Sequence, residues 1–341
     1  MTDSQRITFF VTEIWAWYAR HKRVLPWRDS AETDDTQRAY RVFVSEIMLQ
    51  QTQVPRVIVI FRTFLEKFPT INDLAQASNK DVILAWKGMG YNSRALRLRD
   101  AARIIIDEHN GIFPSDYDQL LSIKGIGPYT AAAIRNFAFN MATPCIDTNI
   151  RRILHRTFVG PETADGEWEM NDKKLLKIAE EVLNVAIEPE FQFSNFNFPF
   201  RCDAANWHAA LMDFGSLVQT KSNPKWDICP LTEKGIMKTT KKNFESRILN
   251  NGNQTSKFKL QNSTRREPGR FEGAKYVPNR IFRGRIVDAL REHDHLTFDQ
   301  LGPQICSDWN SEHHAWLKKI LHKLTQDALI AKRGDVFVLA E

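Results

Sequence analysis

From residue 4 to residue 219, apolar residues recur mostly at helical spacing, and no run of alternating apolar and polar positions interrupts them. This pattern predicts an all-α body. Short turns that carry Pro or Gly, such as "KFPTIND" and "GIFPSD", separate the periodic segments. The expected helices cover residues 4–20, 38–52, 55–67, 79–86, 92–109, 116–121, 128–139, 148–156, 170–186 and 203–218.

The pattern changes twice toward the C-terminus. Residues 187–202 are aromatic and bounded by Pro, and we expect an ordered insertion that packs its Phe side chains, with a ligand contact as the alternative. Beyond Cys229 the chain becomes polar, basic and poor in aliphatic residues, which is typical of a linker or a basic arm. From about residue 277, three helical segments precede a Gly-Asp turn and a β-branched run, which predicts a winged helix. The expected parts are residues 1–232, a linker over 233–276 and a domain over 277–341.

Composition limits the function. The chain has 341 residues, 43% of them hydrophobic, so it can bury a full core. Its 47 Lys and Arg against 41 Asp and Glu favour a polyanionic partner over an acidic substrate. Four widely spaced cysteines without a C-x-x-C pair indicate neither a disulfide framework nor a zinc site. The N-terminus lacks the features of a signal peptide, and no apolar run approaches about 18 residues, so we expect a cytoplasmic protein without membrane contact.

The stretch "LSIKGIGPYTAAAI" places two glycines directly before an alanine-rich segment. Gly125 and Gly127 allow a tight hairpin between two short helices, and Pro128 suits the first turn of the second helix. Such a hairpin directs backbone N–H groups toward whatever lies in front of it, and a phosphate fits those donors. Taken alone, a G-x-G segment is more often only a tight turn between helices.

Further motifs place this hairpin in a wider pattern. "LPWRDS", "YRVFVSEIMLQQTQV", "FPTINDLAQAS", "AWKGMGYNSRALRL", "GIGPYTAAAI", "CIDTNIRRIL" and "HAALMDFG" follow one another in the order and approximate spacing of the helix-hairpin-helix (HhH-GPD) DNA glycosylases. The resemblance covers residues 5 to about 232 and is greatest to the MutY-type adenine DNA glycosylases. It implies a two-lobed helix-hairpin-helix fold and a partner that is double-stranded DNA with a mispair or an oxidised base.

The resemblance also implies catalytic roles. Glu46 matches the general acid that protonates the departing base, and its apolar neighbours are consistent with the raised pKa that this role needs. Asp147 matches the carboxylate that stabilises the developing sugar cation, and it is equally placed to cap the helix that follows. Tyr129 stands where bifunctional relatives carry a nucleophilic lysine. Because a phenol cannot form a Schiff base, we expect a monofunctional enzyme.

Other matched positions imply contacts with DNA. Trp27, Arg28 and Asp213 correspond to residues around the extruded base. Two glutamines and a tyrosine correspond to residues that fill or wedge the duplex, and the hairpin and a later loop supply phosphate contacts. The residues implied in binding DNA are Gln50, Gln51, Tyr91, Lys124, Gly125, Gly127, Thr130, Lys221 and Lys225.

The chain departs from the family in two places. Most members hold an iron–sulfur cluster with four cysteines after the "MDFG" segment, and here those positions read Gln219, Trp226, Cys229 and Gly235. One thiolate cannot hold the cluster, so we expect no cofactor and no metal, with Trp226 and packing in its place. The usual C-terminal domain, which recognises the oxidised guanine, has no counterpart. The basic linker and the predicted winged helix stand where it would be.

The function expected from these features is that of a monomeric, nucleoid-associated DNA glycosylase of base excision repair. Adenine opposite 8-oxoguanine or guanine is the first candidate substrate. A thymine or uracil mismatch glycosylase is the enzymatic alternative, because a related branch also has Tyr and Asp at the positions of Tyr129 and Asp147. A non-catalytic protein that binds damaged DNA is the third, although the presence of both Glu46 and Asp147 argues against it.

Overall fold

A computed structural model describes residues 1–28, 32–163, 168–192, 198–246 and 267–341. Within these ranges no helix is both long and apolar enough to cross a membrane. The chain forms two compact units. The first contains Met1–Val42, Pro114–Ser122 and Ile126–Gln261, and the second contains Phe43–Phe113, Ile123–Gly125 and Asn262–Glu341.

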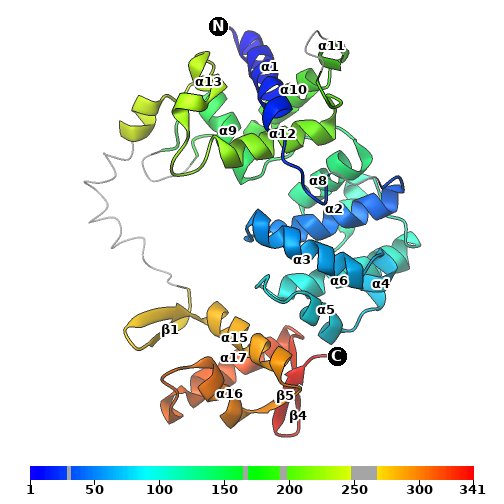
Figure 1. Cartoon of the computed structure of the whole chain (residues 1–341), viewed down its shortest axis with the longest axis vertical. Coiled ribbons are helices and arrows are strands. Elements are labelled where there is room, and N and C mark those ends of the chain that lie inside the picture. Colours follow the sequence, from blue (N-terminus) through cyan, green and yellow to red (C-terminus); the bar gives the residue numbers. More distant parts are fainter. Residues whose placement is uncertain (29–31, 164–167, 193–197, 247–266) are drawn as a thin grey trace. The chain divides into compact units, whose positions relative to one another are not determined.

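The first unit is helical (Figure 1). Its elements are α1 (Asp3–His21), the start of α2 (Asp35–Leu49), α7 (Tyr117–Ser122), α8 (Pro128–Phe139), α9 (Thr148–Leu154), η1 (His155–Val159), α10 (Asp172–Ala186), α11 (Pro189–Gln192), α12 (Ala204–Leu217), η2 (Trp226–Ile228) and α13 (Pro230–Glu233). Helix α1 begins at a capping box on Thr2 and buries one apolar face against α10 and α12.

Aromatic side chains dominate the core of this unit. Trp15 and Trp207 are fully buried, with ring centroids 5.2 Å apart. Phe198 and Phe200 stack on each other and pack against Trp15, with centroid distances to Trp15 of 6.4 and 5.4 Å. The expected packing of the Phe-rich insertion is therefore confirmed for these two residues, while residues 193–197 lie outside the described ranges.

The second unit contains the end of α2, four further helices and the C-terminal domain. The helices are α3 (Val54–Lys67), α4 (Ile71–Gln76), α5 (Asn79–Ala85) and α6 (Ser93–His109). The predicted helices all form, but α4 is an addition. It starts at a capping box on Thr70 and spans six residues, which is too short to give a periodic signal. Helix α2 ends at Leu49, three residues before its predicted end.

The C-terminal domain has the winged-helix order of elements. These are β1 (Gly269–Glu272), β2 (Lys275–Pro278), α15 (Asn279–Glu292), β3 (Leu296–Thr297), α16 (Phe298–Ile305), η3 (Ser311–His313), α17 (His314–Gln326), β4 (Ile330–Arg333) and β5 (Val336–Leu339). The antiparallel sheet has the strand order β3-β5-β4, and Gly334, with a φ of 59°, turns the β4–β5 hairpin. The predicted winged helix is therefore confirmed.

A further hairpin precedes the helices of this domain. Strands β1 and β2 form it, with Phe271 opposite Tyr276, and most of it lies within the range expected to be linker. An ion pair between Arg270 and Asp308, at 2.6 Å, ties the hairpin to the rest of the domain. The polar, basic composition hid these strands because their stability comes from contacts that are distant in sequence. Residues 247–266 of the expected linker lie outside the described ranges, and the domain division at residues 232 and 277 stays a prediction.

Candidate functional site

Glu46 lies in the last turns of α2, in the second unit. Glu46 is 6% exposed, and Val44, Ile47 and Met48, which are close to it in the sequence, are all buried. The burial expected of this part of α2 is therefore present, and a general acid at this position would be withdrawn from bulk water.

The two turns that carry Gln51 and Tyr91 have unusual backbones. Gln51 has a φ of 59° and Tyr91 a φ of 46°, which place both residues in the left-handed region. Neither is a glycine, so each conformation costs roughly 1–3 kcal/mol and persists only where contacts with the surroundings offset that cost. Gln50, Gln51 and Tyr91 are all exposed. The structure thus presents the predicted duplex-contacting side chains on the surface of the second unit.

Arg94 contacts both turns, a role that no sequence motif indicates. Arg94 is only 3% exposed, and burial lowers the pKa of its guanidinium group to about 10. The guanidinium also lies 5.5 Å from the ring centroid of Tyr91. It donates to the carbonyl oxygens of Ile47, Met48, Gln50, Met89 and Gly90, and to the hydroxyl of Thr52. The hydrogen bonds of this one buried arginine therefore stabilise the two turns in which the left-handed residues lie.

Asp147 lies in the first unit, at the N-cap of α9. Its Oδ1 accepts from the backbone N–H groups of Asn149, at 2.9 Å, and Ile150, at 2.6 Å, so the predicted cap is confirmed. Burial raises the pKa of the Asp147 carboxyl, while these hydrogen bonds and the charge of Arg152 act in the opposite direction. The carboxylate is thus desolvated and held rigidly, as a group that stabilises a developing cation should be.

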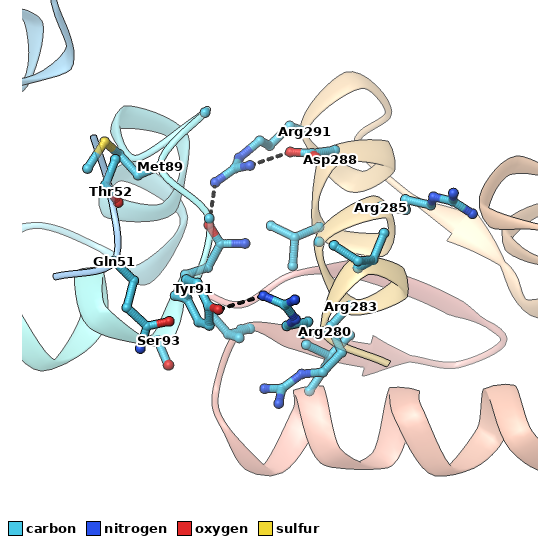
Figure 2. A pocket seen from close by; sticks show the side chains of 18 of the residues that line it. Gln51, Thr52, Met89, Tyr91, Ser93, Arg280, Arg283, Arg285, Asp288 and Arg291 are labelled. Carbon is cyan, nitrogen blue, oxygen red and sulfur yellow. Dashed lines mark hydrogen bonds and ion pairs between the residues drawn. The ribbon is translucent and has the colours of Figure 1, made fainter. Parts of the chain in front are cut away.

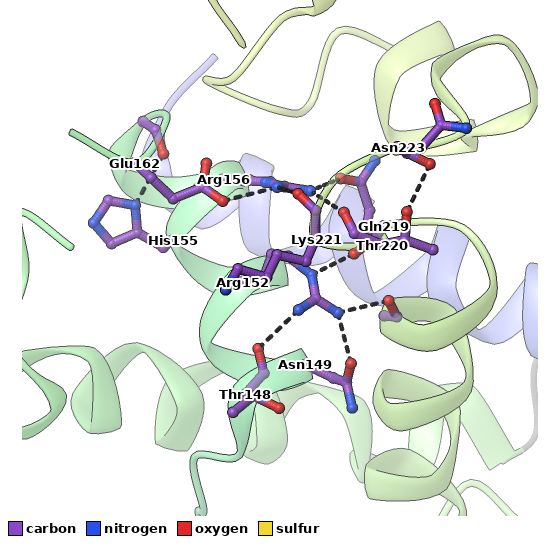
Figure 3. Close-up of polar contacts among 12 residues, drawn as sticks. Thr148, Asn149, Arg152, His155, Arg156, Glu162, Gln219, Thr220, Lys221 and Asn223 are labelled. Atoms are coloured by element: carbon purple, nitrogen blue, oxygen red, sulfur yellow. Dashed lines mark hydrogen bonds and ion pairs between the residues drawn. The ribbon is translucent and has the colours of Figure 1, made fainter. Parts of the chain in front are cut away.

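A network of side chains holds Asp147 through Asn149, and Figure 3 shows how Arg152 in turn contacts Asn149. Asn149 donates from Nδ2 to Asp147 Oδ2 at 3.0 Å and accepts from Arg152 Nη2 at 2.6 Å. Arg152 also donates to the carbonyl of Gly215, at 2.7 Å, and to that of Gln219. A Cβ atom on Gly215 would lie 2.7 Å from the Cβ of Asn149, so only glycine permits this approach of α12 to α9. Sequence reasoning missed these positioning residues.

The glycine hairpin connects α7 to α8. Gly125 has a φ of 105°, and Gly127 is the extended N-cap of α8, with Pro128 at its first position. Lys124, Gly125 and Gly127 are exposed, as a phosphate site requires. Thr130 is buried, so its side chain does not belong to the exposed surface. Its amide lies in the first turn of α8, where helices leave donors without internal partners.

Tyr129 is partly buried and packs against the core of the first unit. No lysine occupies its position, so this residue cannot form a Schiff base.

Arg28 and Asp213, which were both predicted to line the base pocket, form an ion pair at 2.8 Å. Asp213 lies on α12 with a fully buried side chain, and Arg23 also binds it, with 2.6 Å between Arg23 Nη2 and Asp213 Oδ1. Trp27, in the same segment, is 6% exposed. Asp213 therefore anchors the segment that contains Trp27. Sequence reasoning missed Arg23 as a second partner of this carboxylate.

The profile of the HhH-GPD superfamily of base excision DNA repair proteins matches residues 44–187. The adenine DNA glycosylase of Mycolicibacterium smegmatis is 35% identical over 220 residues, which are 64% of this chain and 67% of that protein. The human adenine DNA glycosylase is 36% identical over 232 residues, which are 67% of this chain and 39% of that protein.

The chain belongs to the HhH-GPD superfamily. It spans 39% of the length of the human relative and 65% of that of the adenine DNA glycosylase of Mycobacterium tuberculosis.

Solved structures of this superfamily share the fold. A thermostable thymine-DNA glycosylase has a TM-score of 0.57 at 24% identity, covering 69% of this chain and 96% of that chain. A trapped endonuclease III–DNA covalent intermediate has a TM-score of 0.52 at 18% identity, covering 70% and 96%. At these identities the likeness establishes the fold of this HhH-GPD chain, in agreement with the predicted helix-hairpin-helix class.

Packed side chains occupy three of the four positions that the family resemblance assigns to the cysteines of an iron–sulfur cluster. Gln219, Trp226 and Cys229 are buried, and Gln219 Nε2 lies 3.3 Å from Cys229 Sγ. Arg156 is fully buried and donates to Gln219 Oε1 at 3.1 Å (Figure 3). Gly235 has a φ of 63°. Among the described residues, no three His, Cys, Asp or Glu side chains gather as a metal site.

Arg156 organises this packed region. It pairs with the buried Glu162 at 2.8 Å, donates to the carbonyls of Thr220 and Lys221, and stacks over Phe244 at 4.7 Å. Trp226 contacts the same Phe244 ring at a centroid distance of 5.4 Å. The loop that contains Lys221 and Lys225 is thereby tied to η1, and both lysines are exposed on it, as phosphate contacts would be.

We expect Arg156→Met to lower the free energy of unfolding by about 3–5 kcal/mol, because it removes the guanidinium that pairs with the buried charge of Glu162. Urea denaturation followed by circular dichroism measures the loss. Arg151→Met is the matched control, since Arg151 pairs with the half-exposed Asp172 and its loss should cost less than about 1 kcal/mol. Equal losses in the two variants would contradict a structural role for Arg156.

Proposed function

We propose that this chain is a monofunctional DNA glycosylase of base excision repair that releases adenine paired with 8-oxoguanine or guanine in double-stranded DNA. The observation that carries the proposal is that both candidate catalytic carboxyl groups are held within the protein. Glu46 is buried, and Asp147 is fixed at the start of α9 by hydrogen-bond donors. The adenine DNA glycosylases that the chain resembles support the choice of base.

The two carboxyl groups divide the chemistry. The Glu46 carboxylic acid donates its proton to a ring nitrogen of adenine, so that the base leaves neutral when the bond between the sugar C1′ and the base nitrogen breaks. The Asp147 carboxylate stabilises the sugar cation that develops. Water then adds to C1′ and loses a proton, which leaves an abasic site and free adenine. Arg152 and Asn149 keep Asp147 in place during these steps.

The proposed activity ends at the abasic site. Tyr129 supplies no amine, so no covalent enzyme–sugar intermediate of the Schiff-base kind forms at that position. We expect intact strands after incubation, strand breaks only after alkali, and no protein–DNA adduct after borohydride. A borohydride-trapped adduct in the stoichiometry of the released base would contradict the monofunctional assignment.

No cofactor is part of the proposal. The cluster positions do not fit an iron–sulfur cluster, because only Cys229 offers a thiol. We propose that the buried contacts of Arg156, Gln219 and Phe244 take over the structural task of the cluster, which keeps Lys221 and Lys225 on the exposed loop. The protein acts as a monomer on DNA of the nucleoid.

A thymine or uracil mismatch glycosylase is the second candidate, because Tyr129 and Asp147 suit that chemistry equally well. A panel of end-labelled duplexes that hold each possible mispair, with and without 8-oxoguanine, separates the candidates after alkali treatment. Cleavage at adenine supports the proposal, and cleavage at thymine or uracil replaces it with the second candidate. Tight binding without cleavage of any duplex indicates a non-catalytic damage-binding protein.

A further inference from the structure

A pocket in the second unit lies where helix α15 of the winged-helix domain meets the turns around Gln51 and Tyr91 (Figure 2). One wall consists of residues 51–53, Arg56 and residues 88–93, and the other is mainly α15. Arg280, on α15, donates to the hydroxyl of Tyr91 at 2.8 Å. Gln51 and Tyr91, the exposed residues with left-handed backbones, thus line the same pocket as helix α15 of the C-terminal domain.

Specific contacts fix α15 on this side of the second unit. Arg291 is 3% exposed and donates to the carbonyl of Ile83, at 2.8 Å, and to Asn92 Oδ1, at 3.0 Å. Ile83 and Leu96 belong to the same buried cluster as the core of the winged helix. Burial lowers the pKa of Arg291, while its hydrogen bond and its ion pair with Asp288 act in the opposite direction. Arg291 is therefore a structural clamp and not a ligand group.

The pocket lining is strongly basic. It includes Arg56, Arg280, Arg283, Arg285 and Arg291, against Asp288 as the single acidic residue. The side chain of Arg280 is 47% exposed, and its ion pair with Glu267 is equally exposed, so this pair contributes little and can exchange for a stronger anion. Arg56 is also exposed, and it contacts the carbonyl of Gly88 at 3.3 Å. These two arginines, one from each wall, are the cations best placed to receive a ligand.

We propose that this pocket is a binding site for the phosphate backbone of DNA, in which Arg56 and Arg280 contact phosphate oxygens next to Gln51 and Tyr91. The inference rests on the proposed function, in which double-stranded DNA is the partner. It adds a DNA contact made by the winged-helix domain. Guanidinium groups bind phosphate through paired N–H donors, and a few such contacts set the salt dependence of binding. The hydrogen bond from Arg280 also links that contact to the position of Tyr91.

The test is the dependence of log Kd on log KCl concentration for an undamaged, fluorescein-labelled duplex, measured by fluorescence anisotropy. We expect Arg56→Gln and Arg280→Gln each to reduce the slope by about one, and the double variant by about two, with weaker binding at every salt concentration. Arg280→Lys should retain the slope, because the charge remains. Arg333→Gln is the matched control. It removes the same charge from β4 of the same domain, where Arg333 is 57% exposed and does not line the pocket.

A double variant whose slope and Kd equal those of Arg333→Gln overturns the proposal. Thermal melting followed by circular dichroism verifies that each variant is folded. Base release by the wild-type protein is measured in parallel. If no base is released, the proposed function fails, yet the slope comparison still decides whether the pocket binds a phosphate backbone. If base is released and the slopes do not differ, only the phosphate site fails.

Discussion

Glu46→Gln should slow the release of adenine by about 10²–10⁴-fold, because glutamine has nearly the shape of glutamic acid but no proton to give to the departing base. Glu46 is buried in α2, and an isosteric change keeps the volume of its side chain, so the packing is disturbed little. The rate is measured under single-turnover conditions from alkali-sensitive sites in a labelled duplex. Binding of the same duplex, measured by anisotropy, should change by much less than the rate.

The matched control for this variant is Glu66→Gln. Glu66 is exposed on α3 of the same unit, and its substitution makes the same chemical change at a position without a proposed role. Both variants should melt close to the wild-type temperature. A Glu46→Gln protein that releases base at near the rate of the control would show that the general acid lies elsewhere.

Asp147→Asn should lower the rate by about 10²–10³-fold, because the amide cannot offer a negative charge to the developing sugar cation. Asp147 also caps α9, so part of any effect could come from a weakened helix start. Asp203→Asn separates the two contributions. Asp203 is the N-cap of α12 and accepts from the backbone N–H of Asn206 in the same manner. This control should retain its rate.

The pH dependence gives a second readout for Asp147. The proposed role needs the ionised carboxylate, and burial raises the pKa of this group above its ordinary value of 3.8. The rate should therefore fall as the pH drops through this raised pKa, which places the acid limb at a higher pH than that of an unperturbed aspartate. In Asp147→Asn this limb should disappear. A profile of unchanged shape in the variant would show that another group produces the limb.

Local patterns predicted much of the fold. Helices α1, α6 and α10 have a continuous apolar face, so their period in the sequence gives their extent to within a few residues. The cap at Asp147 could also be predicted, because the chemistry of a helix start involves only the next three residues. Hairpin β1–β2 was missed, since its polar strands are stabilised by distant contacts such as that of Arg270 with Asp308.

Sequence motifs indicated the candidate catalytic residues but not the residues that hold them in position. Glu46 and Asp147 are parts of short motifs, whereas Arg94, Arg152 and Arg156 act through carbonyl oxygens and side chains far away in the sequence. Every residue has a backbone carbonyl oxygen, so the amino-acid sequence does not show which carbonyl groups accept these hydrogen bonds. The contact of Arg280 with Tyr91 joins residues 189 positions apart and was out of reach for the same reason.

The most direct measurement of the central claim is the identification of the released base by mass spectrometry. The purified chain of residues 1–341 is incubated with a duplex that holds adenine opposite 8-oxoguanine, and a Glu46→Gln/Asp147→Asn double variant is treated in parallel. We predict free adenine in a one-to-one ratio with abasic sites from the wild-type protein, intact strands before alkali, and no adenine from the double variant. Bound duplex without free adenine, or equal release by the double variant, would contradict the assignment of a DNA glycosylase that acts through these two carboxyl groups.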